Sequence, residues 1–96
     1  MTKEEIKHKI SPILEKYGIE YAGIFGSAAR GEEKAGSDID IVVSTDREIG
    51  VYEFIALQYE LEEILGKKVD LVSRKSINKY IRPYIEKDLT SIYERL

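Results

Sequence analysis

A chain of 96 residues, 43% hydrophobic and 34% charged, suits a single domain over residues 1–96 and excludes both a disordered protein and a catalytic core with a separate substrate domain. A net charge of −3, with Lys and Arg scattered along the chain, argues against broad binding to nucleic-acid backbones. Cysteine is absent, which excludes disulfides, thiolate zinc sites and a cysteine nucleophile, and no apolar run approaches bilayer length, so we expect a cytoplasmic protein that does not enter membranes.

The first expected element is a helix from about residue 3 to residue 17. Thr2 and Glu5 have the spacing of a capping box, and apolar residues then recur at helical intervals up to Tyr17. Gly18 is the expected end of this helix. Pro12 either kinks the helix or begins a second helical piece that Ser11 caps.

The rest of the chain alternates between strands and helices. Residues 19–25 and 39–43 predict two strands, the second after a turn at 35–37, and a helix is expected between Gly50 and Gly66. A third strand at 69–73, a helical stripe over 77–85 interrupted at Pro83, and a short last strand at 90–93 follow. This order predicts an α/β fold, a small mixed β-sheet flanked by helices, in which strands 39–43 and 69–73 are parallel.

Two of these strands carry an aspartate within an otherwise apolar run, namely Asp40 and Asp70. Burial of an ionised carboxylate without a partner is unfavourable, so such residues are usually paired or bind metal. Asp38 lies two residues before Asp40, and strand side chains alternate, so both carboxylates project from one face. Hard cations such as Mg²⁺ prefer these oxygen ligands. We therefore predict a catalytic and metal-binding site of Asp38, Asp40 and Asp70 that has room for two ions.

Two of these carboxylates also have a simple structural explanation. Asp38 follows a Gly-Ser turn, and taken alone it reads more often as a turn residue than as a ligand. Asp70 shares a strand face with Lys68 and can form a salt bridge with it. Asp40 is harder to explain in this way, and the combination of the three favours the metal site.

A glycine-containing segment, residues 26–31, follows the first predicted strand and can begin a helical turn. Free backbone N–H groups at such a turn, with the Ser27 hydroxyl beside them, form a site for a phosphate chain. Gly26 lets the backbone approach the phosphates without a β-carbon in the way. Arg30 either contacts phosphate or ties the loop to a nearby Glu. We predict Gly26, Ser27 and Arg30 as nucleotide-binding residues.

The order of these motifs resembles a known signature. Gly26-Ser27, ten further residues, Asp38-Ile39-Asp40 and later Asp70 in a strand are similar to the pattern of the DNA polymerase beta superfamily of nucleotidyltransferases. Residues 23–31 and 37–43 look like the minimal nucleotidyltransferase branch, often called MNT. The similarity continues through residues 65–72 and 89–94, so it covers nearly the entire chain.

The resemblance implies a palm-type, DNA polymerase beta-like nucleotidyltransferase fold. Many MNT proteins resemble antitoxins encoded beside a helical HEPN ribonuclease toxin, which they inactivate by transferring AMP from ATP to a tyrosine of that toxin. Because all three carboxylates are present here, the resemblance implies an active protein adenylyltransferase. It would use ATP as substrate and two Mg²⁺ ions, and it would form a hetero-oligomer with a HEPN-type toxin.

Two other functions stay open. The chain can be a binding module that neutralises a partner by complex formation alone, with a vestigial or structural metal site. Transfer to an RNA end or to a small molecule is the third reading, and it is disfavoured because the sequence shows neither a basic groove nor an additional acceptor domain.

Overall fold

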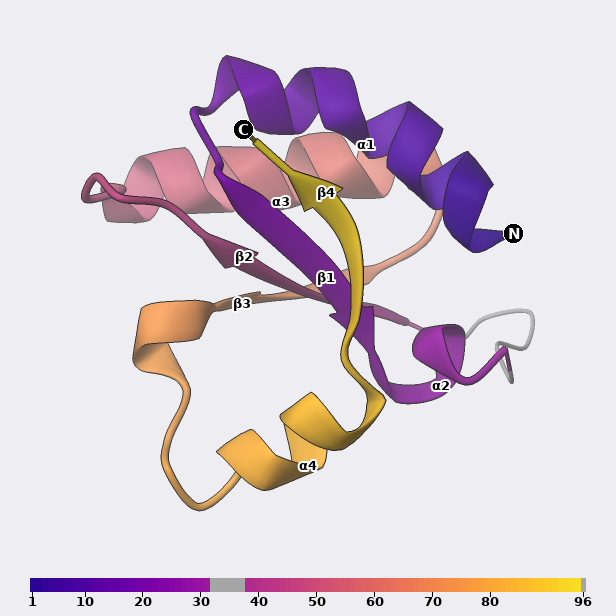
Figure 1. The fold of residues 1–96 in the computed structure, drawn as a ribbon. Coiled ribbons are helices and arrows are strands. Elements are labelled where there is room, and N and C mark those ends of the chain that lie inside the picture. The colour runs from indigo at the N-terminus through magenta and orange to yellow at the C-terminus, as the bar shows by residue number, and fades with distance from the viewer. Residues whose placement is uncertain (32–37, 96) are drawn as a thin grey trace.

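The computed structural model describes residues 1–31 and 38–95, so the turn expected at 35–37 lies outside the described residues. The described strands form a mixed sheet in the order β3-β2-β1-β4. Helices α1 and α3 cover one face of this sheet, and α4 lies on the other (Figure 1). The element bounds are α1 Lys3–Lys16, β1 Tyr21–Phe25, α2 Gly26–Ala29, β2 Ile39–Ser44, α3 Val51–Leu65, β3 Val69–Ser73, the 3₁₀ turn η1 Arg74–Ser76, α4 Arg82–Asp88 and β4 Thr90–Glu94.

Helix α1 begins as the sequence predicts. The Thr2 hydroxyl accepts a hydrogen bond from the Glu5 backbone N–H, and the Glu5 carboxylate accepts one from the Thr2 N–H, which completes the capping box. Pro12 lies within this one helix. The expected second helical piece with Ser11 as its cap is not formed, because the Ser11 hydroxyl donates to the Lys7 carbonyl oxygen at 2.5 Å, one turn earlier.

The strand pairings fix the position of the predicted aspartates. Strand β2 pairs antiparallel with β1 and parallel with β3, which confirms the parallel relation expected from the long connection through α3. Strand β4 pairs antiparallel with β1, so the sheet is mixed. Asp40 is opposite Asp70 of β3 on one side and opposite Phe25 of β1 on the other.

The two faces of the sheet are packed differently. Alternate residues of β2, such as Ile39 and Ile41, are buried under α1 and α3 in the main core, where burial of apolar surface stabilises the fold most. On the opposite face, Val42 joins a smaller cluster with Ile77 and Ile85, which holds α4 against the sheet. The main core consists of Ile6, Ile10, Leu14, Ile19, Ala22, Ile24, Ala28, Ile39, Ile41, Val43, Leu57, Leu61, Leu65, Val69, Leu71, Ile92 and Tyr93.

The C-terminal part differs from the sequence-based prediction at Pro83. We expected this residue to interrupt a helix, but it lies in the first turn of α4, where its missing N–H has no helical acceptor to lose. The expected helix over 77–85 therefore starts only at Arg82: residues 77 and 78 have no regular structure and residues 79–81 form a turn. The last strand, β4, is present and ends at Glu94. In the part of the chain that the structure describes, no helix is both long and apolar enough to span a bilayer.

Candidate active site

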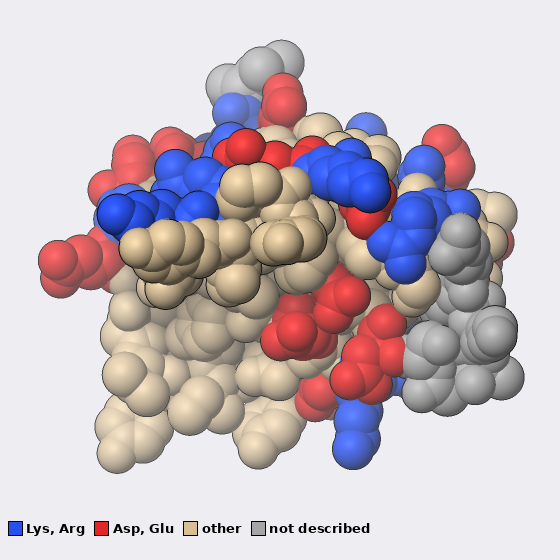
Figure 2. Space-filling model, turned by 90° about the horizontal axis from the view of Figure 1, so that it is seen from below, with Lys and Arg blue, Asp and Glu red and all other residues tan. Residues whose placement is uncertain are grey.

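Parallel pairing of β2 and β3 brings Asp40 and Asp70 side by side. The two residues occupy the same register position, and their side chains project on the α4 side of the sheet, opposite to Ile39 and Ile41. The two carboxylates are close enough for Asp70 to raise the pKa of Asp40. Asp40 is partly buried, whereas Asp70 is exposed. Figure 2 shows Asp and Glu side chains gathered near the centre of this face of the molecule.

The electrostatics of Asp40 are those of a carboxylate in a crowded acidic site. Burial raises the pKa of Asp40 above its ordinary value, and the negative charges of Asp70 and Asp38 and the hydrogen bond with Asp70 raise this pKa further. The positive charge of Arg30 acts in the opposite direction on the same pKa. A cation bound between these carboxylates would offset the repulsion between their negative charges.

The donor set therefore fits a hard cation in its chemistry, since it consists of carboxylate oxygens alone. The side chains do not form a complete metal site in this structure. Among residues 1–31 and 38–95, no three His, Cys, Asp or Glu side chains are grouped closely enough to hold a metal ion. Asp38 precedes β2 and is exposed. The alternative salt bridge of Asp70 with Lys68 is not formed within the described residues.

Gly26 lies against Asp40 at the end of β1. It begins the short helix α2 with a φ of +68°, and a β-carbon at this position would overlap the Asp40 Oδ2 atom. Only glycine fits both the backbone conformation and this contact. The segment 26–29 turns immediately after the strand, as the sequence predicts, and Ser27 follows Gly26 within it. The expected phosphate-binding residues therefore adjoin the acidic pair.

Arg30 is held by a residue that the sequence analysis missed. Its Nη1 atom lies 2.5 Å from Oδ2 of Asp88, at the end of α4, and the Asp88 side chain is only 18% exposed. Among the described residues, Arg30 is thus tied to Asp88, across a separation of 58 residues, while the Glu residues at 32 and 33 lie outside the described residues. Nothing in the sequence connects these two positions, because the contact depends on how α4 packs beside α2. The ion pair orients the guanidinium near the acidic pair.

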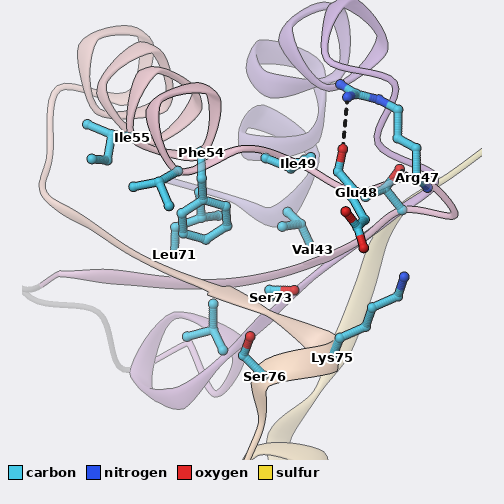
Figure 3. A pocket seen from close by; sticks show the side chains of 13 residues that line it. Val43, Arg47, Glu48, Ile49, Phe54, Ile55, Leu71, Ser73, Lys75 and Ser76 are labelled. Carbon is cyan, nitrogen blue, oxygen red and sulfur yellow. Dashed lines mark hydrogen bonds between the residues drawn. The ribbon is translucent and has the colours of Figure 1, made fainter.

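A pocket of about 590 Å³ lies away from these residues. Its walls include Val43, Ile49, Phe54 and Leu71, at the C-terminal ends of β2 and β3 and the start of α3 (Figure 3). Asp40 and Asp70 stand near the opposite ends of the same strands. The pocket is also lined by Arg47, Glu48 and Lys75, so it holds a single carboxylate. We place the chemistry at the acidic pair, because this pocket lacks paired carboxylates and the glycine turn that phosphate chemistry requires.

Known families and proteins resemble this chain over most of its length. The family model described as "Polymerase beta, Nucleotidyltransferase" matches residues 8–96. The chain is 47% identical over 85 residues to a protein of Methanocaldococcus jannaschii that is provisionally named protein adenylyltransferase MJ0435. The match covers 88% of this chain and 91% of that protein. It is 35% identical over 97 residues to protein adenylyltransferase MntA of Thermococcus cleftensis, with 96% and 97% covered.

Solved structures share the fold. A minimal nucleotidyltransferase superposes with a TM-score of 0.79 at 26% identity, over 94% of this chain and 95% of that chain. A chain of a toxin–antitoxin structure with AMP-PNP gives a TM-score of 0.82 at 23% identity, over 93% and 73%. A complex of tri-AMPylated Shewanella oneidensis HEPN toxin with MNT antitoxin gives 0.77 at 20% identity, over 98% and 74%.

The fold and these relatives define the protein as a nucleotidyltransferase enzyme. The chain belongs to the polymerase beta nucleotidyltransferase family, and its small four-stranded sheet has the form of the minimal nucleotidyltransferase branch.

Proposed function

We propose that this protein is a Mg²⁺-dependent protein adenylyltransferase, which transfers AMP from ATP to a tyrosine hydroxyl of a HEPN-type toxin and thereby acts as its antitoxin. The observation that carries this proposal is the contact between Asp40 and Asp70, with Gly26 against Asp40. The relatives named protein adenylyltransferase, and the complex of an AMPylated HEPN toxin with an MNT antitoxin, support the choice of nucleotide and acceptor.

Asp38, Asp40 and Asp70 would hold the metal. Mg²⁺ bound there would neutralise charge on the triphosphate and lower the pKa of the attacking hydroxyl. Gly26 and Ser27 would bind the β and γ phosphates through backbone N–H groups and the hydroxyl, which orients the α-phosphate. Arg30, held by Asp88, would contact the nucleotide phosphates.

The reaction is an in-line displacement. The acceptor hydroxyl oxygen forms a bond to the α-phosphorus, the bond from the α-phosphorus to the oxygen bridging to the β-phosphate breaks, and pyrophosphate leaves. Asp70 is the more exposed carboxylate of the pair, so it faces the side from which an acceptor arrives. We assign to Asp70 both a share in metal binding and uptake of the hydroxyl proton.

We expect the acceptor side of this site to lack a wall of its own, because Asp70 is exposed. Tyr80 and Ile81 before α4 and Tyr84 within α4 are exposed as well. A protein acceptor would supply the missing wall and bring its hydroxyl to attack distance, which raises the rate through proximity. A small acceptor has few groups here that would hold it.

The test is the Asp40→Asn variant. We expect it to abolish transfer of label from α-labelled ATP and to weaken Mg²⁺·ATP binding by calorimetry at least about tenfold, since a metal ligand is lost. Because the variant removes repulsion with Asp70, its melting temperature in metal-free buffer should equal or exceed that of the unmodified protein. Asp46→Asn, at an exposed position beyond the end of β2, is the control and should change neither quantity.

Two outcomes would contradict the proposal. Unchanged Mg²⁺·ATP affinity in Asp40→Asn would remove the metal site from this position. An Asp40→Asn protein that no longer transfers AMP but still neutralises the toxin would make the chain a binding module whose function is complex formation alone.

A further inference from the structure

The solvent-facing side of α3 carries apolar side chains that nothing in the described chain covers. Tyr52 is 89% exposed, Tyr59 is 66% exposed and Ile55 is 39% exposed, and Ala56 beside them is also exposed. The opposite side of the same helix already supplies the core through Leu57, Leu61 and Leu65. A surface helix normally has one apolar face, so a second one indicates an interaction surface.

The spacing of these residues along α3 is the same when it is counted from either end of the helix. Tyr52, Ile55, Ala56 and Tyr59 follow each other at intervals of three, one and three, so the pattern has its midpoint between Ile55 and Ala56. If two such helices pack antiparallel about a two-fold axis through this midpoint, Tyr52 of one copy lies opposite Tyr59 of the other. Ala56 at the centre allows the helix axes to approach closely. A two-fold interface requires this kind of self-complementary surface.

The pocket described above lies directly beside this stripe. Val51 and Ile55 of α3 belong to its wall, together with Phe54 and Leu71, whose side chains are labelled around it in Figure 3. Its volume of about 590 Å³ admits an aromatic ring. If a second α3 packs antiparallel against the first, its Tyr59 lies near the N-terminal half of the first helix, where this pocket opens.

The neighbouring edge of the sheet favours contact through helices over contact through strands. Strand β3 is at the edge, but at Val69 the backbone N–H donates to Glu62 Oε2 at 2.9 Å, and the carbonyl accepts from Gln58 Nε2 at 2.9 Å. These α3 side chains occupy the outward backbone groups of Val69, which a further strand would need for pairing at the start of β3. The apolar stripe and the pocket therefore offer the accessible surface on this side.

We propose that two copies of this chain form a two-fold dimer through α3, with Tyr59 of each copy packed at the Val51–Ile55 pocket of the other. Four tyrosines at roughly 150 Å² each supply about 600 Å², and the aliphatic side chains raise the buried total toward the roughly 1,000 Å² that a specific interface needs. The interface is thus small, and we expect a dissociation constant in the micromolar range. The acidic pair lies on the α4 side of the sheet and stays open in this dimer.

The first test is the oligomeric state. In sedimentation velocity from about 1 µM to 1 mM protein, the unmodified chain should shift from monomer to dimer. Ala56→Glu places a charge at the centre of the interface, and Tyr59→Glu places one where Tyr59 packs at the pocket of the other copy. Each substitution should weaken association about 100-fold or more. Tyr84→Glu is the matched control, because Tyr84 is 76% exposed on α4, and it should dimerise normally. Circular dichroism checks that each variant is folded.

Cross-linking tests the antiparallel arrangement itself, since the chain has no cysteine of its own. Ala56→Cys should form a disulfide with its own copy, and a mixture of Tyr52→Cys with Tyr59→Cys should form the mixed disulfide in preference to either homodimer. A chain that stays monomeric over the whole concentration range would overturn the proposal. Dimers that tolerate Ala56→Glu, or cross-linking of Tyr84→Cys as efficient as that of Ala56→Cys, would overturn it as well. Equal Mg²⁺·ATP affinity of Ala56→Glu and the unmodified chain separates this result from the proposed catalytic function.

Discussion

Gly26 shows how one residue without a side chain defines the site. Its positive φ and its contact with Asp40 are both incompatible with alanine. We expect Gly26→Ala to destabilise the fold by about 1–2 kcal/mol through backbone strain, and also to displace Asp40 and weaken Mg²⁺·ATP binding by about tenfold or more. The changes are measured by denaturant unfolding and calorimetry.

Gly31 provides a matched control for this prediction. Its φ is +72°, close to that of Gly26, but a β-carbon there would meet no atom within 4 Å. Gly31→Ala should therefore show a similar loss of stability with nearly unchanged nucleotide affinity. If both variants bind Mg²⁺·ATP equally well, Gly26 serves the backbone alone and its contact with Asp40 has no role in binding.

Ser27 tests which part of the nucleotide the turn contacts. Removal of its hydroxyl in Ser27→Ala deletes one hydrogen-bond donor, which contributes about 1 kcal/mol when the acceptor is a phosphate oxygen of the bound ligand. We expect the affinity for Mg²⁺·ATP to fall several-fold and the affinity for AMP to stay nearly constant, as measured by calorimetry. Equal losses for the two nucleotides would mean that Ser27 does not bind the β and γ phosphates.

Among the elements, α4 depends on a glycine in the neighbouring strand. A β-carbon at Gly23 of β1 would lie 2.7 Å from Leu89 Cδ1, 2.8 Å from Tyr21 Oη and 3.1 Å from the Thr90 carbonyl oxygen. Because the last of these is backbone, Gly23→Ala should push the α4–β4 connection outward and cost about 1–3 kcal/mol of stability. Gly50→Ala, with no atom within 4 Å of the new β-carbon, should cost well under about 1 kcal/mol. Thermal unfolding of both variants measures these two losses of stability.

A second element contact joins α1 to α3 and depends on pH. Glu60 of α3 accepts hydrogen bonds from the Tyr17 hydroxyl and from Lys16 Nζ, and the bond with Glu60 raises the pKa of Tyr17 to about 12. Because a raised pKa means that the folded state retains the proton, this contribution to stability is complete below pH 10 and is lost as the pH rises to about 12. Tyr17→Phe should remove this part of the alkaline loss in urea unfolding. An identical pH profile in the variant would show that the contact contributes nothing.

For the molecule as a whole, the described buried apolar residues form one main core and one minor cluster, so we expect the acidic pair to be open on the acceptor side. The isolated protein should therefore transfer AMP slowly. Addition of a HEPN-type toxin encoded beside this gene should accelerate transfer of label from α-labelled ATP to that toxin by about 100-fold or more. Label that goes equally well to short RNAs or aminoglycosides, with the toxin unmodified, would contradict the choice of a protein acceptor.

The order of the main helices and strands and the parallel pair could be predicted from sequence patterns, and the same patterns named the residues of the candidate site. Local rules account for these predictions: the capping box of α1, the apolar, β-branched run of β2, and, among the described residues, a glycine at each position with a positive φ. Asp40 and Asp70 were recognisable because a carboxylate within an apolar strand is costly without a function or a partner.

The contacts between residues far apart in the sequence could not be predicted and are known from the tertiary structure. The register of β2 on β3 places Asp40 opposite Asp70, and the packing of α4 brings Asp88 to Arg30, although neither contact has a local sequence signal. The pocket beside α3 likewise arises from two separate stretches of the chain, residues 43–55 and 71–76. Local propensity acts over a few residues, whereas these contacts depend on how whole elements bury their apolar faces against one sheet.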